Sequence, residues 1–385
     1  MSKGRISVGG WYQRTTLHLT EVYDFLSRIE SSEQLSKKKL QSFHKKLNIK
    51  SVERKYGTLE YVHAITHDGI EIKYFEDGLY LLESSNLQSE EKIVTYYEKS
   101  FKPAITYLFS LGAPTPKILA SMKEKHRVVI SKISSTPNTF VVPKKYGVVY
   151  SKIKSKNTAV YKTANHIFIV AKPNLKDLLG NLVAMQIFFR EFKDQLKKYM
   201  HIHRIVWEEI KQLSERDDVK GSELGPYRLK LDSYKKTINF ITERMAQMAP
   251  YAKTREELAN SLNVQHHLLD LFHYRFEDLF DTLTYVQRIW SMTVSYVDSA
   301  IKLISDIQAG STSRSIRSIQ VLASIGVIAG FLNYLRIEEI KGITLTGTIY
   351  LFVLILIAYL INKGMKKYYK NKQYSITFVP FKKFE

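Results

Sequence analysis

Cysteine is missing from this chain of 385 residues, and some chemistry is excluded with it. The protein owes nothing to disulfide bonds and has no thiolate nucleophile. It also lacks the Gly-x-x-x-x-Gly-Lys loop that holds nucleotide phosphates and the tight turn that presents a nucleophilic serine in hydrolases. These absences predict that the protein is not an enzyme.

Residues that break helices are scarce in the second half, where no proline follows Pro250 until Pro380. The sequence predicts one long helix over residues 175–213 and a second over 227–248, which Pro250 ends. A third helix can then run from Thr254 for roughly 80 residues, because nothing interrupts it.

Apolar residues recur along this third helix at steps of three and four, with one phase shift, as in a coiled coil. A helix cannot bury a stripe of this length alone. Further copies of it, together with the two preceding helices, must cover the stripe, so we expect a symmetric homo-oligomer. The residues of the stripe are Leu269, Phe272, Phe276, Leu279, Leu283, Val286, Trp290, Val294, Val297, Ile301 and Ile304.

Two long apolar runs, residues 318–335 and 343–361, stand near the C-terminus. As helices each would be roughly 27–28 Å long, about the hydrocarbon thickness of a bilayer. They predict a membrane hairpin. Lysine and arginine flank the pair on its outer sides, which places both chain ends in the cytoplasm. Because MSKGRISVGG lacks the apolar core of a signal peptide, we expect a multi-pass protein of the inner (plasma) membrane, in contact with the lipid bilayer.

The first part of the chain mixes helical and strand patterns. Helices are predicted at 20–29, 33–47 and 90–111, and strands at 57–65, 70–75, 79–83, 127–133, 139–142, 146–153, 158–163 and 167–171. The predicted parts are a cytoplasmic α/β domain (1–172), a long-helix stalk (173–315), two membrane spans (316–362) and a basic cytoplasmic tail (363–385). The expected fold class is therefore an α+β cytoplasmic domain with a long helical stalk and two C-terminal transmembrane helices.

Positive charge is concentrated between Phe101 and Lys176, where fourteen lysine or arginine residues face one acid, Glu124. A basic block within a folded region predicts an anionic partner: a nucleotide, a nucleic acid or a lipid head group. The alternative is a basic surface that lies beside anionic lipid. The leading ligand-binding candidates are Arg127, Lys144, Lys145, Lys152, Lys154 and Lys156, the last three at the period of a strand face.

The order of these parts resembles CorA-type metal-ion channels. The stretch Ser315 to Gly330, SIRSIQVLASIGVIAG, looks like the stalk-to-pore junction of that family. The family's Gly-Met-Asn signature is missing, and Leu332-Asn333-Tyr334-Leu335 stands in its place. The resemblance implies a homopentamer whose first spans line a pore, with Mg²⁺ as a candidate divalent cation. A divergent member would be similar to the CorA-like membrane proteins of type III CRISPR defence, which a nucleotide second messenger activates.

One face of the first apolar run carries mostly small or polar residues and is the predicted pore lining. It consists of Ser315, Ile319, Ala323, Gly326, Gly330 and Asn333. Glu338 and Glu339 would concentrate cations at the outer mouth. The alternative is close helix packing, because Gly326 and Gly330 form a small-xxx-small motif.

A metal site is a further candidate. His266, Asp270, His273 and Glu277 step by 4, 3 and 4, so on one helix their imidazoles and carboxylates would share a face. Such a face could bind a divalent metal at a subunit contact, or it could simply be solvated.

Three functions compete at this level. The favoured one is a CorA-like ion channel that an anionic nucleotide gates, with no direct binding of DNA or RNA. The others are a housekeeping transporter of divalent cations (Mg, Co, Ni or Zn) and a non-conducting, membrane-tethered binding protein.

Overall fold

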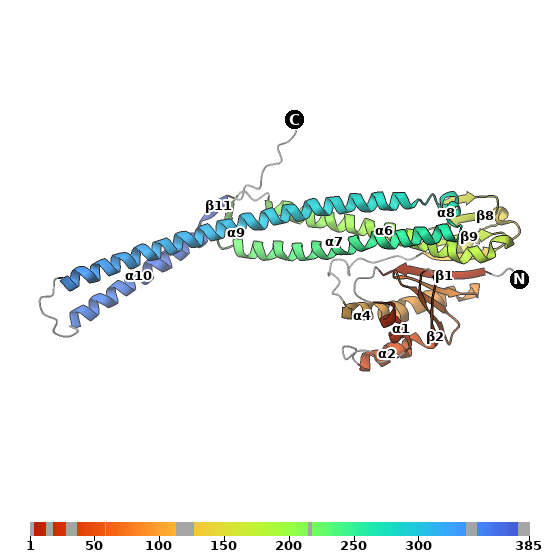
Figure 1. Ribbon diagram of the computed structural model, residues 1–385, viewed down its shortest axis with the longest axis horizontal. Coiled ribbons are helices and arrows are strands. Elements are labelled where there is room, and N and C mark those ends of the chain that lie inside the picture. Colours follow the sequence, from red (N-terminus) through yellow and green to blue (C-terminus); the bar gives the residue numbers. More distant parts are fainter. Residues whose placement is uncertain are drawn as a thin grey trace, which may run out of the picture. The chain divides into compact units, whose positions relative to one another are not determined.

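The computed structural model describes residues 4–12, 18–27, 37–57, 59–112, 127–214, 218–335 and 345–375. The chain forms two compact units. The first consists of Met1–Ile202 with Phe240–Ile289, and the second of His203–Asn239 with Trp290–Glu385. The order of the elements along the chain can be followed in Figure 1.

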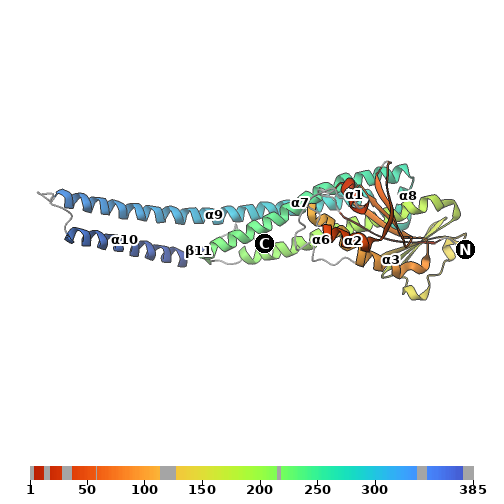
Figure 2. The same cartoon turned by 90° about the horizontal axis from the view of Figure 1, so that it is seen from below.

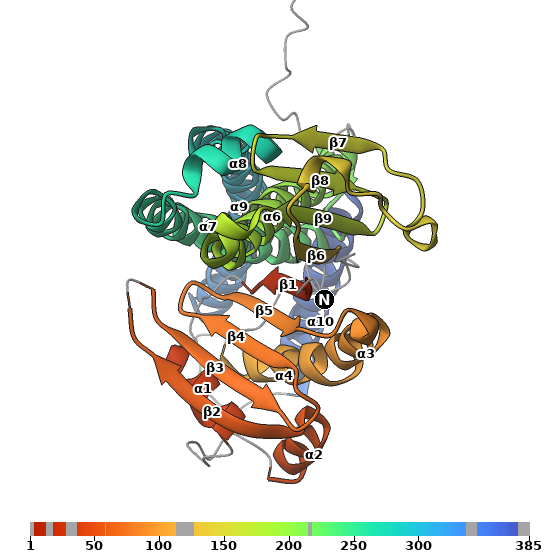
Figure 3. The ribbon, with the colours of Figure 1, turned by 90° about the vertical axis from the view of Figure 1, so that its right-hand side faces the viewer.

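In the described part of the first unit, nine strands form one mixed sheet in the order β2-β3-β4-β5-β1-β6-β9-β8-β7 (Figure 3). All neighbours are antiparallel except β6 and β9. The strands are β1 (Gly4–Trp11), β2 (Ile49–Lys55), β3 (Tyr61–Thr66), β4 (Glu71–Phe75), β5 (Leu79–Ser84), β6 (Val128–Ile133), β7 (Ser151–Lys154), β8 (Thr158–Lys162) and β9 (His166–Ala171).

Two short turns, at residues 67–69 and 76–78, join β3 to β4 and β4 to β5. Gly69 has φ +76° and Gly78 has φ +89°, a backbone region that favours glycine because it has no Cβ. The alternation of buried and half-buried residues along β3 and β4 follows from one face packing on the core. Two strand predictions are wrong. The strand predicted at 139–142 is absent, because Thr139 ends a 3₁₀ turn and residues 140–142 belong to no strand, and the strand predicted at 146–153 begins only at Ser151.

Helices α1 (Leu19–Ser27), α2 (Lys37–Leu47), α3 (Glu90–Tyr96) and α4 (Lys102–Gly112) belong to the first unit. Between α3 and α4 lies a π-helical segment, η2 (Tyr97–Phe101). Buried Ile93, Tyr97, Phe101 and Ile105 are spaced four apart, which exceeds the 3.6 residues of an α-helical turn. A widened π turn keeps all four on the core side.

Long helices make up most of the rest of the described chain (Figure 2). They are α6 (Lys176–Ser214), α7 (Leu224–Ser261), α8 (Gln265–Phe272), α9 (Phe276–Leu335) and α10 (Leu345–Asn371). The short strands β10 (Asp218–Lys220) and β11 (Gln373–Ser375) pair antiparallel in the second unit.

The prediction that Pro250 ends a helix is wrong, because α7 continues through this residue to Ser261. The proline lies on the exposed side of α7, whereas Met245, Met248 and Ala252 are fully buried. Burial of the apolar side of α7 therefore outweighs the backbone hydrogen bond that proline cannot donate.

The prediction of a single third helix is also wrong, because the helix is interrupted at two places. Asn263 (φ +53°) follows the end of α7, and His273 (φ +55°) follows the end of α8. Left-handed residues of this kind end helices, and asparagine and histidine tolerate that conformation better than most residues. The chain then starts again as α9 at Phe276.

The two predicted membrane spans are contradicted, and with them the transmembrane fold class and the inner-membrane localisation. Of the helices in the described ranges, none combines the length and the apolar character needed to cross a bilayer. The first run forms the end of α9, where Gln320 and Ser324 are exposed polar residues. Residues 345–361 of the second run lie in α10, and the same helix continues into lysine-rich sequence up to Asn371. The described fold is α+β, with a mixed sheet and long helices.

Within the first unit, α6 and α7 are fixed to the sheet by buried polar contacts. Arg255 of α7 donates two hydrogen bonds to Asp77, at 2.6 and 2.8 Å, and both side chains are at most 1% exposed. Trp11 donates to the carbonyl of Asp77 and stacks on Phe192 of α6. Arg190 of α6 donates to the carbonyl of Gly9.

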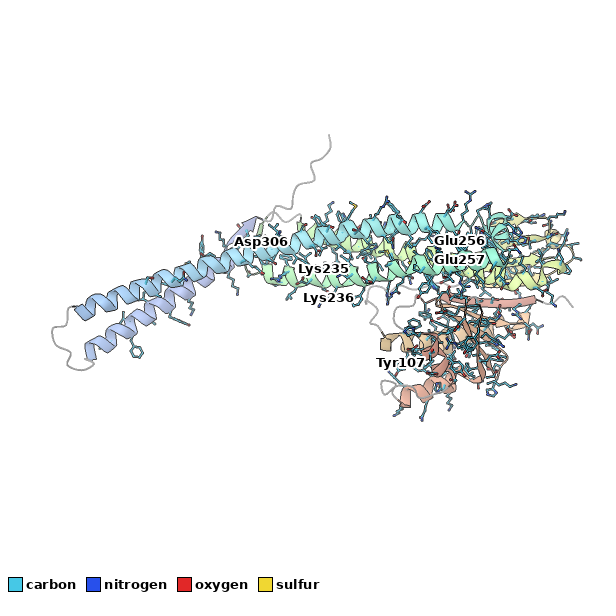
Figure 4. All side chains as sticks on the ribbon, in the orientation of Figure 1. Tyr107, Lys235, Lys236, Glu256, Glu257 and Asp306 are labelled. Atoms are coloured by element: carbon cyan, nitrogen blue, oxygen red, sulfur yellow. The ribbon has the colours of Figure 1, made fainter. Side chains whose placement is uncertain are left out.

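In the second unit, parts of α6, α7 and α9 pack together. His203 of α6 lies 2.7 Å from the Thr293 hydroxyl of α9, and Lys235 of α7 pairs with Asp298 of α9 at 2.6 Å. Lys235 is labelled on α7 in Figure 4.

Of the predicted apolar stripe, which extends over both units, Leu279 and Trp290 are fully buried within the single chain. The stripe is thus largely covered by the chain itself.

Candidate functional site

The six predicted ligand-binding residues do not lie on one strand face. Lys152 and Lys154 lie in β7, opposite Tyr161 and Ala159 of β8. Because side chains alternate between the faces of a strand, both lysines share the face of Tyr161. Lys156 lies in the turn between β7 and β8, and Lys144 and Lys145 begin the 3₁₀ turn η4 (Lys144–Tyr146).

These five lysines are exposed, and within the described part of the chain none forms an ion pair. Two of them cover aromatic rings: Lys145 Nζ lies 4.7 Å from the ring centre of Tyr146, and Lys152 Nζ lies 5.2 Å from that of Tyr161. The predicted basic surface therefore exists, but it is spread over a loop and a strand.

Arg127, the sixth candidate, stands with other cations at the start of β6. It lies within electrostatic range of Lys162 at the end of β8, as does Lys193 of α6, and we call these three residues the cation cluster. Both Arg127 and Lys193 lower the pKa of Lys162 by electrostatic repulsion, although burial of the Lys162 ammonium lowers that pKa more. Lys162 follows Tyr161 in β8, so it faces away from Lys152 and Lys154.

Aromatic rings form the base of the cation cluster. Lys162 Nζ lies 5.5 Å from the ring centre of Phe272, and Lys193 Nζ lies 5.0 Å from that of Tyr274. The two rings stack on each other with their centres 5.3 Å apart. Burial raises the pKa of Tyr274, so its phenol stays neutral at physiological pH and supplies no charge to balance the ammonium groups.

Nearby carboxylates are already engaged. Glu191 accepts two hydrogen bonds from Arg190, at 2.8 and 3.0 Å, and Asp194 lies 3.7 Å from Lys197. Among the described residues, the three members of the cation cluster form no ion pair with a carboxylate. Three cations that lie close together without a paired carboxylate favour the binding of an anion.

Arg127 links the cation cluster to an exposed aromatic ring. Its Nη1 donates to the hydroxyl of Tyr150 at 3.1 Å, and Tyr150 is 59% exposed. The backbone carbonyl of Arg127 accepts from Arg190 at 3.2 Å, which fixes this part of β6 to α6. A planar ligand could stack on the free face of Tyr150 while its anionic groups reach the cations.

The predicted metal-binding residues do not share a helix face. His266 and Asp270 lie in α8, His273 is the left-handed residue after it, and Glu277 begins α9. The break at His273 removes the helical spacing on which this prediction depended. No metal-binding group of three or more histidine or acidic residues is found where the structure describes the chain.

The predicted pore residues all lie on α9, and Ala323 and Gly330 are exposed. Neither Gly326 nor Gly330 has a described neighbour close enough to contact an added side chain, so neither glycine is needed for packing within the described chain. The predicted outer-mouth residues Glu338 and Glu339 lie outside the described residues.

Lys162 lies within the predicted basic block but is not among the six predicted ligand-binding residues, and Lys193 lies outside that block. No spacing pattern could have joined them, because they come from a strand and a helix 31 positions apart (193 − 162). The one available signal was the excess of positive charge.

Comparison with known proteins adds no relative: no protein-family model, no curated protein and no solved structure matches the chain. The resemblance to CorA-type channels stays a prediction from the sequence.

Proposed function

We propose that the first unit is a binding domain for a phosphate-bearing ligand of the nucleotide class, held at the cation cluster. The single observation that carries the proposal is Lys162, a partly buried ammonium group without a carboxylate partner in the described chain, next to Arg127 and Lys193. Such a grouping is unfavourable alone and becomes favourable when an anion binds.

The chemistry of the site favours phosphate. Two ammonium groups and one guanidinium supply only hydrogen-bond donors, and Arg127 can hold two phosphate oxygens at once. The exposed ring of Tyr150, hydrogen-bonded to Arg127, offers a stacking surface for a nucleobase. The five exposed lysines around β7 raise the local positive potential and would steer the ligand toward the site.

Gating of an ion channel is not part of this proposal, because that activity required the membrane spans that the described helices do not provide. The proposal is confined to ligand binding.

Calorimetric titration of the full chain with a panel of cyclic and linear nucleotides tests it. The double variant Lys162→Met and Lys193→Met should weaken the tightest-binding nucleotide by at least about tenfold, since each charged contact contributes about 1.5–3 kcal/mol. Methionine keeps the unbranched apolar part of both side chains, out to Cε, and removes the charged amino group.

The matched control is Lys236→Met with Lys253→Met, two exposed lysines of α7 that form no ion pair in the described chain (Lys236 is labelled in Figure 4). It removes the same net charge and should leave the affinity within about twofold. The proposal is overturned if no nucleotide binds, or if the two double variants lose affinity equally.

A further inference from the structure

A second basic site lies at the other end of the sheet order, where α2 faces α3 and η2. It is an open cleft of about 730 Å³, which we call the α2–α3 cleft. This volume is within the range of about 300–1,000 Å³ typical of small-ligand sites. No residue of the cation cluster lines it.

Four lysines line the α2–α3 cleft: Lys45 and Lys46 of α2, Lys92 of α3 and Lys99 of η2. Lys92 is neutralised by Asp68, which lies 2.9 Å away. The other three form no ion pair among the described residues. They leave a concentration of unpaired ammonium groups within one small concave surface, which favours an anion.

The π-helical segment contributes Lys99 and Ser100 to the lining of the cleft. The amide of Lys102 donates to the carbonyl of Tyr97, five residues earlier, so the helix is one residue wider per turn at this point. Each added residue rotates the later part of the helix by about 100°. π segments are rare and occur often at functional sites, because they re-aim side chains without breaking the helix.

Neutral and acidic groups complete the lining. Thr95 and Ser100 supply hydroxyls, Asn48 and Gln88 supply amides, and Glu91 supplies a carboxylate without an ion pair in the described chain. Amides and carboxylates next to cations match a ligand that carries several hydroxyl groups besides a phosphate.

Aromatic stacking is not available in this cleft. Its aromatic lining residue, Tyr96, is buried, and the Tyr96 hydroxyl donates to the carbonyl of Leu47 at 2.7 Å. A nucleobase would therefore find no ring to stack on, in contrast to the exposed Tyr150 beside the cation cluster. The lining favours a sugar over a base.

We propose that the α2–α3 cleft binds a phosphorylated sugar. Lys45, Lys46 and Lys99 hold the phosphate, and Glu91 accepts hydrogen bonds from the sugar hydroxyls. The site is independent of the cation cluster, so either proposal can fail without the other.

Calorimetric titration of the full chain with glucose 6-phosphate, fructose 1,6-bisphosphate and inositol trisphosphate tests this proposal. At least one of the three should bind at least tenfold more tightly than inorganic phosphate or glucose, and tenfold more tightly than AMP when the titration uses the variant Lys162→Met with Lys193→Met, in which the cation cluster is disabled. The variant Lys46→Gln with Lys99→Gln should weaken that ligand at least tenfold, and Lys236→Gln with Lys253→Gln should not. All four lysines are exposed, so their replacement leaves the core intact.

A second variant distinguishes binding of the sugar from binding of the phosphate. Glu91→Gln should reduce the affinity for the phosphorylated sugar and leave that for inorganic phosphate unchanged or slightly increased, because it removes a negative charge. The proposal is overturned if none of the three ligands binds below millimolar concentration. It is equally overturned if AMP binds the cleft more tightly than all three, or if the lysine variant titrates like the wild type.

Discussion

Unbalanced charge at single residues is the feature from which the binding proposals follow. Lys162 is the clearest case, because burial and two neighbouring cations lower the pKa of its ammonium group. A protein that only had to fold would gain by replacing it. Residues that cost stability in the free protein are common where a ligand later supplies the missing partner.

The replacement Lys162→Met should therefore have opposite effects on stability and binding. Without ligand, removal of the repelled ammonium should raise the melting temperature by about 1–3 °C. Nucleotide affinity should fall at the same time. Thermal unfolding followed by circular dichroism measures the first effect, and a drop in melting temperature of the unliganded variant would contradict this account of the charge.

The pH dependence gives a second check at the same residue. A lysine whose pKa is lowered in the folded protein binds fewer protons there than in the unfolded chain, so its contribution to stability improves as the pH rises toward 10.5. The stability difference between Lys162→Met and the wild type should accordingly shrink between neutral pH and pH 10. Urea unfolding at several pH values measures it, and a constant difference would show that Lys162 has an ordinary pKa.

At the scale of elements, the sequence predicted those strands and helices whose signals are local. β3, β4 and β5 follow from alternation and from two turns ending in Gly69 and Gly78. β1 was missed because its glycines weaken the local signal. An added Cβ at Gly9 would lie 2.6 Å from the carbonyl oxygen of Tyr80, so the close approach of the neighbouring strand needs this glycine.

Tertiary contacts explain the other differences. α7 passes through Pro250 because its inner side is buried, and the following helix ends at His273 because the chain turns there in a left-handed conformation. The cation cluster also depends on tertiary contacts. Its residues come from a strand start, a strand end and a helix, and the pairing of β9 with both β6 and β8 and the packing of α6 bring them together.

The ion pair between Asp77 and Arg255 should be essential for fixing α7 to the sheet. Asp77→Asn should lower the free energy of unfolding by about 3–5 kcal/mol, because it leaves the Arg255 guanidinium buried without its counter-charge. The double variant Asp77→Asn with Arg255→Met should recover part of this loss. Urea unfolding of Asp77→Asn, Arg255→Met and the double variant measures the coupling, and strictly additive effects would contradict it.

At the scale of the whole chain, the structure weakens the main argument for an oligomer. The apolar stripe of α9 was expected to need further copies of the chain, yet Leu279 and Leu283 are at most 2% exposed in one copy. A homo-oligomer stays a prediction, now without that stripe as its required contact surface.

The variant Leu279→Ala tests whether the apolar stripe is covered by its own chain or by another copy of the chain. It should reduce the free energy of unfolding by about 2–5 kcal/mol through the cavity it creates. If the cover is intramolecular, the size of this loss is independent of protein concentration. The free energy of unfolding of the variant and the wild type is measured at two protein concentrations a hundredfold apart. A difference between them that grows on dilution would place the stripe between subunits.

The central claim, that a nucleotide binds at the cation cluster, is tested most directly by lysine acetylation read out residue by residue with mass spectrometry. A saturating concentration of the tightest nucleotide should slow acetylation of Lys162 and Lys193 at least fivefold, because the bound phosphate covers both amines and raises the pKa of Lys162. Lys236 and Lys253 should react at unchanged rates. Equal rates at Lys162 and Lys193 with and without nucleotide would contradict the account.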